Sequence, residues 1–106
     1  MKATIHPDAE QDIAEAAAFY ERDGSPALAA RFVAEVKRVI NLLLAQPGLG
    51  TPRTDGRKLH TMRVFPYAII YRPIEDGIYV LVVRRHRRRP TFGVDRKQQN
   101  VRKSSE

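Results

Sequence analysis

The sequence predicts a small α+β domain in which a helical hairpin packs on one face of an antiparallel sheet. The chain has 106 residues, of which 42 % are hydrophobic, so it can bury one compact core. In its first half apolar residues recur at spacings of three and four, which is typical of helices. In its second half short apolar runs are separated by turn signals, which is typical of strands. The predicted order is one strand, two helices and a three-stranded antiparallel meander (β-α-α-β-β-β).

The first strand and the first helix lie before residue 24. Residues 3–5 are β-prone, and Pro7 then suits the first turn of a helix, where its missing N–H costs nothing. Helical spacing of apolar residues continues to Tyr20, and Asp23-Gly24 closes the helix. Asp8, Glu10 and Asp12 lie in the first turns, where the helix dipole favours negative charge. We therefore assign these carboxylates to helix electrostatics and not to a catalytic pair.

The second helix is predicted to begin at Pro26, with Ser25 as its N-cap, and to end near Ala45. Its apolar stripe consists of Leu28, Phe32, Val36, Val39, Ile40 and Leu43. Because the connection between the two helices is very short, they should form an antiparallel hairpin.

Three strands are predicted after the turn-like residues 52–56. They cover residues 59–64, 67–71 and 78–83; Phe65-Pro66 ends the first of them, and Glu75-Asp76-Gly77 forms the turn before the last. The last two strands are apolar at nearly every position, so we expect them to be central and covered on both faces. The N-terminal strand is expected to insert into this sheet.

Residues 1–95 are predicted to form a single domain, and residues 96–106 a basic polar tail that is flexible or orders only on binding. The chain has no cysteine, which suits the cytoplasm, and no apolar run approaches the roughly 20 residues that cross a bilayer. The first residues after Lys2 lack the apolar core of a signal peptide. We therefore expect a cytoplasmic protein without a membrane partner.

The net charge of +7 is unevenly distributed. Residues 1–52 hold five Lys or Arg and seven Asp or Glu, whereas residues 53–106 hold fourteen and five. Such a division indicates an acidic or polyanionic partner for the second half, although a basic surface that is only solvated would give the same charge distribution.

The densest basic run directly follows the last predicted strand. It reads Arg84-Arg85-His86-Arg87-Arg88-Arg89-Pro90, with Phe92 close behind. Arginine holds phosphates or carboxylates through a planar fork of donors, and an aromatic ring can stack on a base or fill a pocket. His86 is a candidate acid or base, or a structural residue. His6 and His60 have no partners at ligand spacing, so we expect no metal and no cofactor.

These features resemble the RelE/ParE superfamily of toxins. The resemblance covers roughly residues 3–96. It is carried by the hairpin segments Pro7 to Tyr20 and Ser25 to Phe32, then by Pro47, Gly50, Arg63, Phe65-Pro66-Tyr67, Ile70-Tyr71 and the His86-x-x-Arg89-Pro90 ending. It implies the α+β fold of these toxins and a neighbouring gene for an antitoxin. That ParD-like antitoxin would present an acidic, amphipathic C-terminal segment and form a hetero-oligomer with the toxin.

Members of this superfamily differ in their target. RelE-like members cleave mRNA on the ribosome with lysines and arginines of the central strands and a late tyrosine. Here residues 59–63 lack a central lysine, Ala68 replaces a strand arginine and Phe92 stands near the tyrosine. The chain is thus closer to the ParE and plasmid-stabilisation branch, which poisons DNA gyrase without enzymatic chemistry.

Contacts with the target or the antitoxin are expected from Arg63, Tyr67, Arg84, Arg85, His86, Arg87, Arg88, Arg89 and Phe92. Three alternatives stay open at this stage. The chain could be a ribosome-dependent endoribonuclease that acts through Arg63, His86, Arg87 and Arg89. It could instead be a non-toxic nucleic-acid-binding module, or a family member that has lost its activity.

Overall fold

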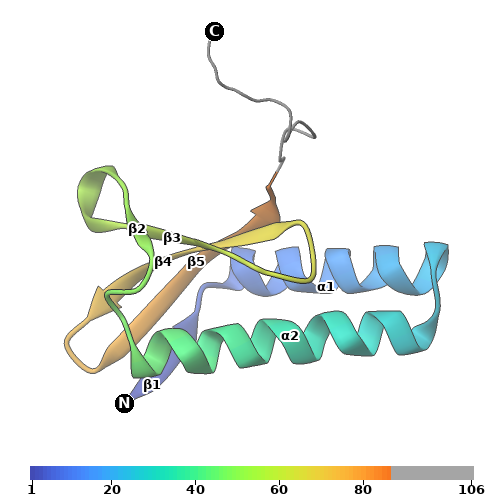
Figure 1. Ribbon diagram of the computed structural model, residues 1–106, viewed down its shortest axis with the longest axis horizontal. Helices are drawn as coiled ribbons and strands as arrows, with labels where there is room; N and C mark the ends of the chain where they lie inside the picture. Colours follow the sequence, from blue (N-terminus) through green and yellow to red (C-terminus); the bar gives the residue numbers. More distant parts are fainter. Residues whose placement is uncertain (87–106) are drawn as a thin grey trace, which may run out of the picture.

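The computed structural model describes residues 1–86, and these form two helices and a five-stranded sheet (Figure 1). In chain order the elements are β1 (Lys2–Ile5), α1 (Pro7–Asp23), α2 (Pro26–Ala45), β2 (Thr51–Pro52), the 3-10 turn η1 (Thr54–Gly56), β3 (Lys58–Thr61), β4 (Tyr67–Ile74) and β5 (Gly77–Arg85). The predicted α+β class, the helical hairpin and the antiparallel meander of β3, β4 and β5 are confirmed.

Both helices begin at a capped proline. The Ser25 hydroxyl accepts a hydrogen bond from the N–H of Leu28 at 3.1 Å, as its position before Pro26 predicts. His6 caps α1 in an unexpected way, because its Nδ1 accepts from the N–H of Asp8 at 2.9 Å. The predicted stripe of α2 faces the core: Phe32, Val36, Val39, Ile40 and Leu43 are all buried.

The strand order is β1-β5-β4-β3-β2. The N-terminal strand therefore does not insert into an antiparallel sheet; it lies at the edge and runs parallel to β5. Gly77, at φ +145, permits this approach, since a Cβ there would overlap the carbonyl oxygen of Lys2. At the opposite edge lies β2, which was not predicted, because a two-residue strand that contains proline carries no periodic signal.

The strand predicted over residues 59–64 ends at Thr61. Residues 62–66 form a loop in which Met62 and Phe65 turn inward while Val64 is 60 % exposed. The loop closes through a hydrogen bond from the N–H of Met62 to the carbonyl of Tyr67 at 2.8 Å. Pro66 cannot donate a ladder bond, so a bend is the favourable way to reach β4.

β4 and β5 are central strands, as predicted, but within residues 1–86 no helix covers their second face. Both helices lie together on one side of the sheet (Figure 1). The side chains that pack with the helices are Ile69 and Tyr71 of β4 and Ile78, Val80 and Val83 of β5. On the opposite face, register places Leu59 beside Ile70 and Val82 in one row, and Thr61 beside Ala68 and Arg84 in the next. This second face is called the open face below.

A buried tyrosine ties the segment after α2 to the sheet. The hydroxyl of Tyr71 donates to the carbonyl of Pro47 at 2.7 Å and accepts from the N–H of Gly50 at 2.9 Å. Gly50 must lack a side chain, because a Cβ would lie 2.8 Å from the same hydroxyl. The chain is thus held where it turns from the helices into β2.

Candidate functional site

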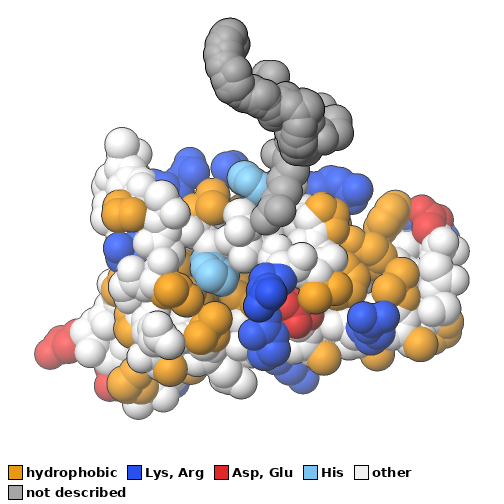
Figure 2. Space-filling view, viewed as in Figure 1, with side chains coloured by type: hydrophobic (Ala, Val, Ile, Leu, Met, Phe, Trp, Pro, Cys, Tyr) orange, Lys and Arg blue, Asp and Glu red, His pale blue; other side chains and the backbone are white. Residues whose placement is uncertain are grey.

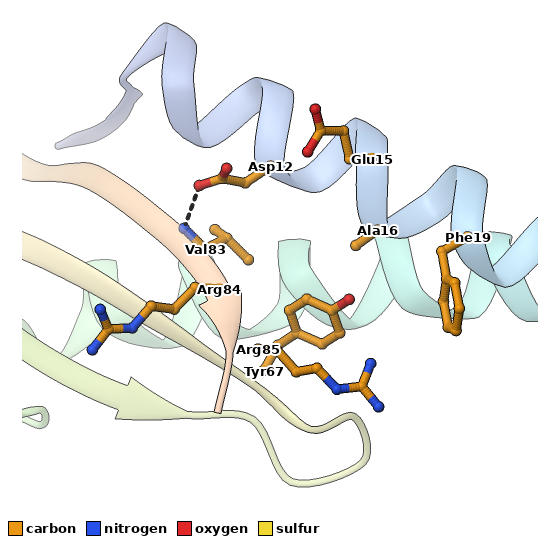
Figure 3. Close-up of a pocket in the computed structure, with 8 residues that line it drawn as sticks. All are labelled: Asp12, Glu15, Ala16, Phe19, Tyr67, Val83, Arg84 and Arg85. Carbon is orange, nitrogen blue, oxygen red and sulfur yellow. Dashed lines mark hydrogen bonds between the residues drawn. The ribbon is translucent and has the colours of Figure 1, made fainter. Parts of the chain in front are cut away.

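A cleft of about 280 Å³ opens between α1 and the strand ends that carry the arginines (Figure 3). The lining residues come from three elements: Asp12, Glu15, Ala16 and Phe19 of α1, Tyr67 of β4, and Val83, Arg84 and Arg85 of β5. Ala16, Phe19 and Val83 contribute apolar lining, and the remaining lining residues include charged residues of both signs.

One hydrogen bond fixes the distance between α1 and β5. The carboxylate of Asp12 accepts from the backbone N–H of Val83 at 3.0 Å, as the dashed line in Figure 3 shows. β1 pairs with β5 only as far as Val80, so the edge of β5 beyond that residue has no neighbouring strand. Asp12 therefore satisfies a donor that would otherwise be left without a partner at this edge.

Phe19 and Tyr67 line the cleft, and both belong to a cluster of packed aromatic rings. Tyr67 packs against Tyr20 and Phe32 with ring centroids 6.3 and 5.2 Å apart, and Phe65 completes the group at 5.1 Å from Tyr20. Burial raises the pKa of the Tyr20 hydroxyl, Tyr67 raises it further, and the charge of Arg85 acts in the opposite direction. Of these groups, Tyr67 and Arg85 line the cleft, whereas Tyr20 contacts Tyr67 without lining it.

The two arginines at the end of β5 differ in direction. Arg85 pairs with Tyr67 across the strands and Arg84 pairs with Ala68, which places them on opposite faces of the sheet. In Figure 3 the Arg85 guanidinium extends towards the Phe19 end of the cleft, whereas that of Arg84 extends the other way. None of the ion pairs within residues 1–86 includes either arginine.

The sequence-predicted site residues fall into three groups. Tyr67, Arg84 and Arg85 lie together at the cleft, and His86 follows them, with its N–H bonded to the carbonyl of Pro66 at 2.9 Å. Arg63 lies in the 62–66 loop, on the side of α2, and does not line the cleft. The remaining predicted residues, Arg87, Arg88, Arg89 and Phe92, lie outside the described residues, as does the predicted tail over 96–106.

A second polar cluster joins α2 to β3. Arg38 donates to Glu35 through Nε at 3.0 Å and Nη2 at 2.7 Å, and this pairing lowers the pKa of Glu35. Arg63 lowers that pKa further. Burial, and then the charge of Arg38, lower the pKa of His60. Figure 2 shows Lys, Arg and His side chains beside an acidic one in the middle of this face.

The α1 wall of the cleft was missed in the sequence. Asp12, Glu15, Ala16 and Phe19 stand at positions i, i+3, i+4 and i+7, which places them on one helical face. That pattern was present, but it was masked by the general excess of acidic residues in this helix. Only the tertiary contact with Val83, 71 residues further along the chain, distinguishes Asp12 from the other acidic residues of α1.

Two of the candidate chemical groups, Arg63 and His86, are attached to the same end of the sheet. The carbonyl of Pro66, in the 62–66 loop that also holds Arg63, accepts a hydrogen bond from the N–H of His86 at 2.9 Å. No group of three or more His, Asp or Glu in this part of the chain could hold a metal ion. None of its helices is long and apolar enough to cross a membrane.

Comparison with known proteins agrees with this architecture. Residues 3–90 match the family described as the ParE toxin of type II toxin-antitoxin system, parDE. Among solved structures, the chain is similar to one titled "Chromosomal ParDE TA system from P. aeruginosa", with a TM-score of 0.73 and 21 % identity. That likeness covers 82 % of this chain and 97 % of the other, and it shows a shared fold. No curated protein matches the chain.

Proposed function

The chain belongs to the ParE toxin family of type II toxin-antitoxin systems, and we propose that it arrests growth by poisoning DNA gyrase until a cognate antitoxin binds and neutralises it. The observation that carries the proposal is the composition of the open face. An RNA-cleaving site on this sheet would need groups that deprotonate the 2′-hydroxyl and stabilise the phosphate charge. The central positions of the face are instead Leu59, Ile70 and Val82, with Ala68 fully buried.

The charged residues of the strands support an acidic partner. None of the five described strands contains Asp or Glu, whereas Lys2, Lys58, Arg72, Arg84 and Arg85 all lie in them. Register places Arg72 and Arg84 on the open face and Lys58 and Arg85 on the helix side, so the strands contribute positive charge to both faces. Positive charge steers a partner of the opposite sign and disfavours basic ones. An acidic antitoxin segment fits such a sheet.

A supercoiling assay tests the gyrase part of the proposal. Purified toxin is added to gyrase and relaxed plasmid, and we expect loss of supercoiling together with trapped, protein-linked DNA breaks. Addition of the protein encoded beside the toxin gene should restore supercoiling. Normal supercoiling at a large molar excess of folded toxin would refute gyrase poisoning.

Ribosome-dependent mRNA cleavage is the alternative to gyrase poisoning. Toeprinting on programmed ribosomes shows whether the toxin cuts mRNA in the A site. We expect no cut with the unaltered toxin. Cuts that disappear in Arg63→Ala or His86→Ala would establish the ribonuclease alternative instead.

A further inference from the structure

The cleft between α1 and β5 holds more negative than positive charge. Asp12 and Glu15 line it with carboxylates, whereas the Arg84 guanidinium extends towards the other face of the sheet (Figure 3) and leaves Arg85 as the cation on this side. Asp8 stands one helical turn before Asp12 and extends the same acidic face of α1. A positively charged occupant is therefore favoured over an acidic one.

Both carboxylates of the cleft can accept a further donor. Asp12 accepts the N–H of Val83 through Oδ2, and Glu15 accepts the side-chain amide of Gln11 through Oε2 at 3.0 Å. An ionised carboxylate accepts at both oxygens, so each of these groups retains one oxygen for another partner. Within residues 1–86 neither carboxylate belongs to an ion pair.

The apolar lining suits the stem of a long cationic side chain. Ala16, Phe19 and Val83 lie beside the carboxylates. Arginine packs its methylene stem on such surface while the guanidinium stays at the charged end, and it also binds over aromatic rings. The cleft encloses about 280 Å³, slightly less than the roughly 300–1,000 Å³ of pockets for cofactors and drug-sized ligands, so it suits a side chain better than a ligand of that size.

The chain carries such side chains directly after the cleft. β5 ends at Arg85, which lines the cleft, and the sequence continues through His86 into Arg87-Arg88-Arg89. Because a chain spans at most about 3.6 Å per residue, this run cannot lie further than roughly 14 Å from Arg85. Residues 87–106 hold seven Lys or Arg against two Asp or Glu, so their charge is opposite to that of the α1 face. A short tether also raises the effective concentration to the millimolar range, which makes weak contacts sufficient.

We propose that the cleft between α1 and β5 is a docking site for the basic run Arg87-Arg88-Arg89 of the same chain. One guanidinium of the run pairs with the carboxylates of Asp12 and Glu15, while its stem lies on Phe19. Exposed ion pairs contribute less than about tenfold each, so the docking is reversible, and a polyanion that offers more charges displaces the run. The docking is independent of the proposed gyrase target, and it makes α1 a competitor for any partner of the run.

Trypsin tests the docking on the complete chain, because it cleaves after arginine and needs an accessible backbone. Mass spectrometry gives the cleavage rates after Arg87 and Arg88 at low ionic strength, each divided by the rate after Arg102 in the same chain. We expect the double variant Asp12→Asn/Glu15→Gln to raise this ratio by roughly tenfold, the combined factor of two exposed ion pairs. Added NaCl should raise the ratio in the unaltered chain in the same way.

Matched variants separate docking from loss of stability. Glu15→Gln alone leaves the bond between Asp12 and Val83 intact and should give part of the increase. Glu21→Gln removes the same charge from the opposite face of α1 and should leave the ratio unchanged. Cleavage after Arg38, within α2, reports unfolding of the domain and should stay equally slow in every variant.

Two results would overturn the proposal. The first is a ratio that does not change in Glu15→Gln and in the double variant, or that rises equally in Glu21→Gln. The second is protection that disappears when the protein is diluted roughly a hundredfold, because the run of a second copy would then occupy the cleft. Protection that is independent of concentration and sensitive to Glu15 supports docking within one chain.

Discussion

The carboxylate of Asp12 accepts a hydrogen bond from the backbone N–H of Val83, which lies 71 residues further along the chain, at 3.0 Å. The bond attaches the first helix to the one stretch of β5 that β1 does not reach. It also sets the width of the cleft, because the two residues form opposite walls.

Loss of this bond should destabilise the fold. We expect Asp12→Ala to lower the free energy of unfolding by about 1–2 kcal/mol, since a charge-assisted hydrogen bond is lost and only partly offset by the higher helix propensity of alanine. Asp12→Asn should cost less, because its amide oxygen can still accept. Urea denaturation measures both, with the exposed Glu21→Ala as control. An unchanged stability in Asp12→Ala would mean that water replaces the bond.

Tyr71→Phe should destabilise the fold more than Asp12→Ala does. The hydroxyl serves both the carbonyl of Pro47 and the N–H of Gly50, and its removal leaves two backbone groups without partners in a buried place. We expect a loss of about 2–4 kcal/mol in the free energy of unfolding. Tyr79→Phe is the matched control, since Tyr79 lies on the same strand pair but is only half-buried. Similar losses in both variants would argue against this role.

Stability should fall at alkaline pH. Burial raises the pKa of Tyr71 above its ordinary value of 10.0, although the Gly50 bond opposes the shift, and burial also raises the pKa of Tyr20. A raised pKa means that the folded state holds its proton longer than the unfolded state. The contribution is therefore complete below about pH 10 and is lost as the pH rises through the folded-state pKa. Urea midpoints from pH 8 upwards measure the slope, which should be shallower in Tyr71→Phe.

Arg38→Gln should raise two pKa values at once. The pKa of Glu35 should rise towards its ordinary value, because its main cause of lowering is the bond from Arg38. The pKa of His60 should rise only in part, because burial is the larger cause there. NMR titration of both side chains measures the changes. Lys37→Gln removes an exposed neighbouring charge from the same helix and should leave both pKa values nearly unchanged.

Substitution of the two arginines of β5 should have different effects on binding of the antitoxin. If the antitoxin binds on the helix side of β5, Arg85→Gln should weaken toxin–antitoxin binding by roughly tenfold or more, whereas Arg84→Gln should have a smaller effect, because its side chain lies on the open face. Isothermal titration calorimetry with the protein encoded beside the toxin gene gives both constants. A larger loss in Arg84→Gln would move the antitoxin contact to the open face.

The sequence by itself determined the elements and the family. Ser25-Pro26, the stripe from Phe32 to Leu43 and the turn before Gly77 act locally, through capping, helical spacing and backbone geometry, so neighbouring residues were enough to predict them. The resemblance to the ParE branch, drawn from the order of such motifs, is confirmed by the family match over residues 3–90.

Tertiary structure alone decided how these elements meet. The edge position of β1, the placement of both helices on one side of β4 and β5, and the pairing of Asp12 with Val83 each depend on segments far apart in the chain. Periodicity states which side chains share a face, but it does not state what lies against that face. For this reason the arginines at the end of β5 were predicted as one basic run. The sheet divides Arg84 from Arg85, and only Arg85 shares its face with Tyr67 and the helices.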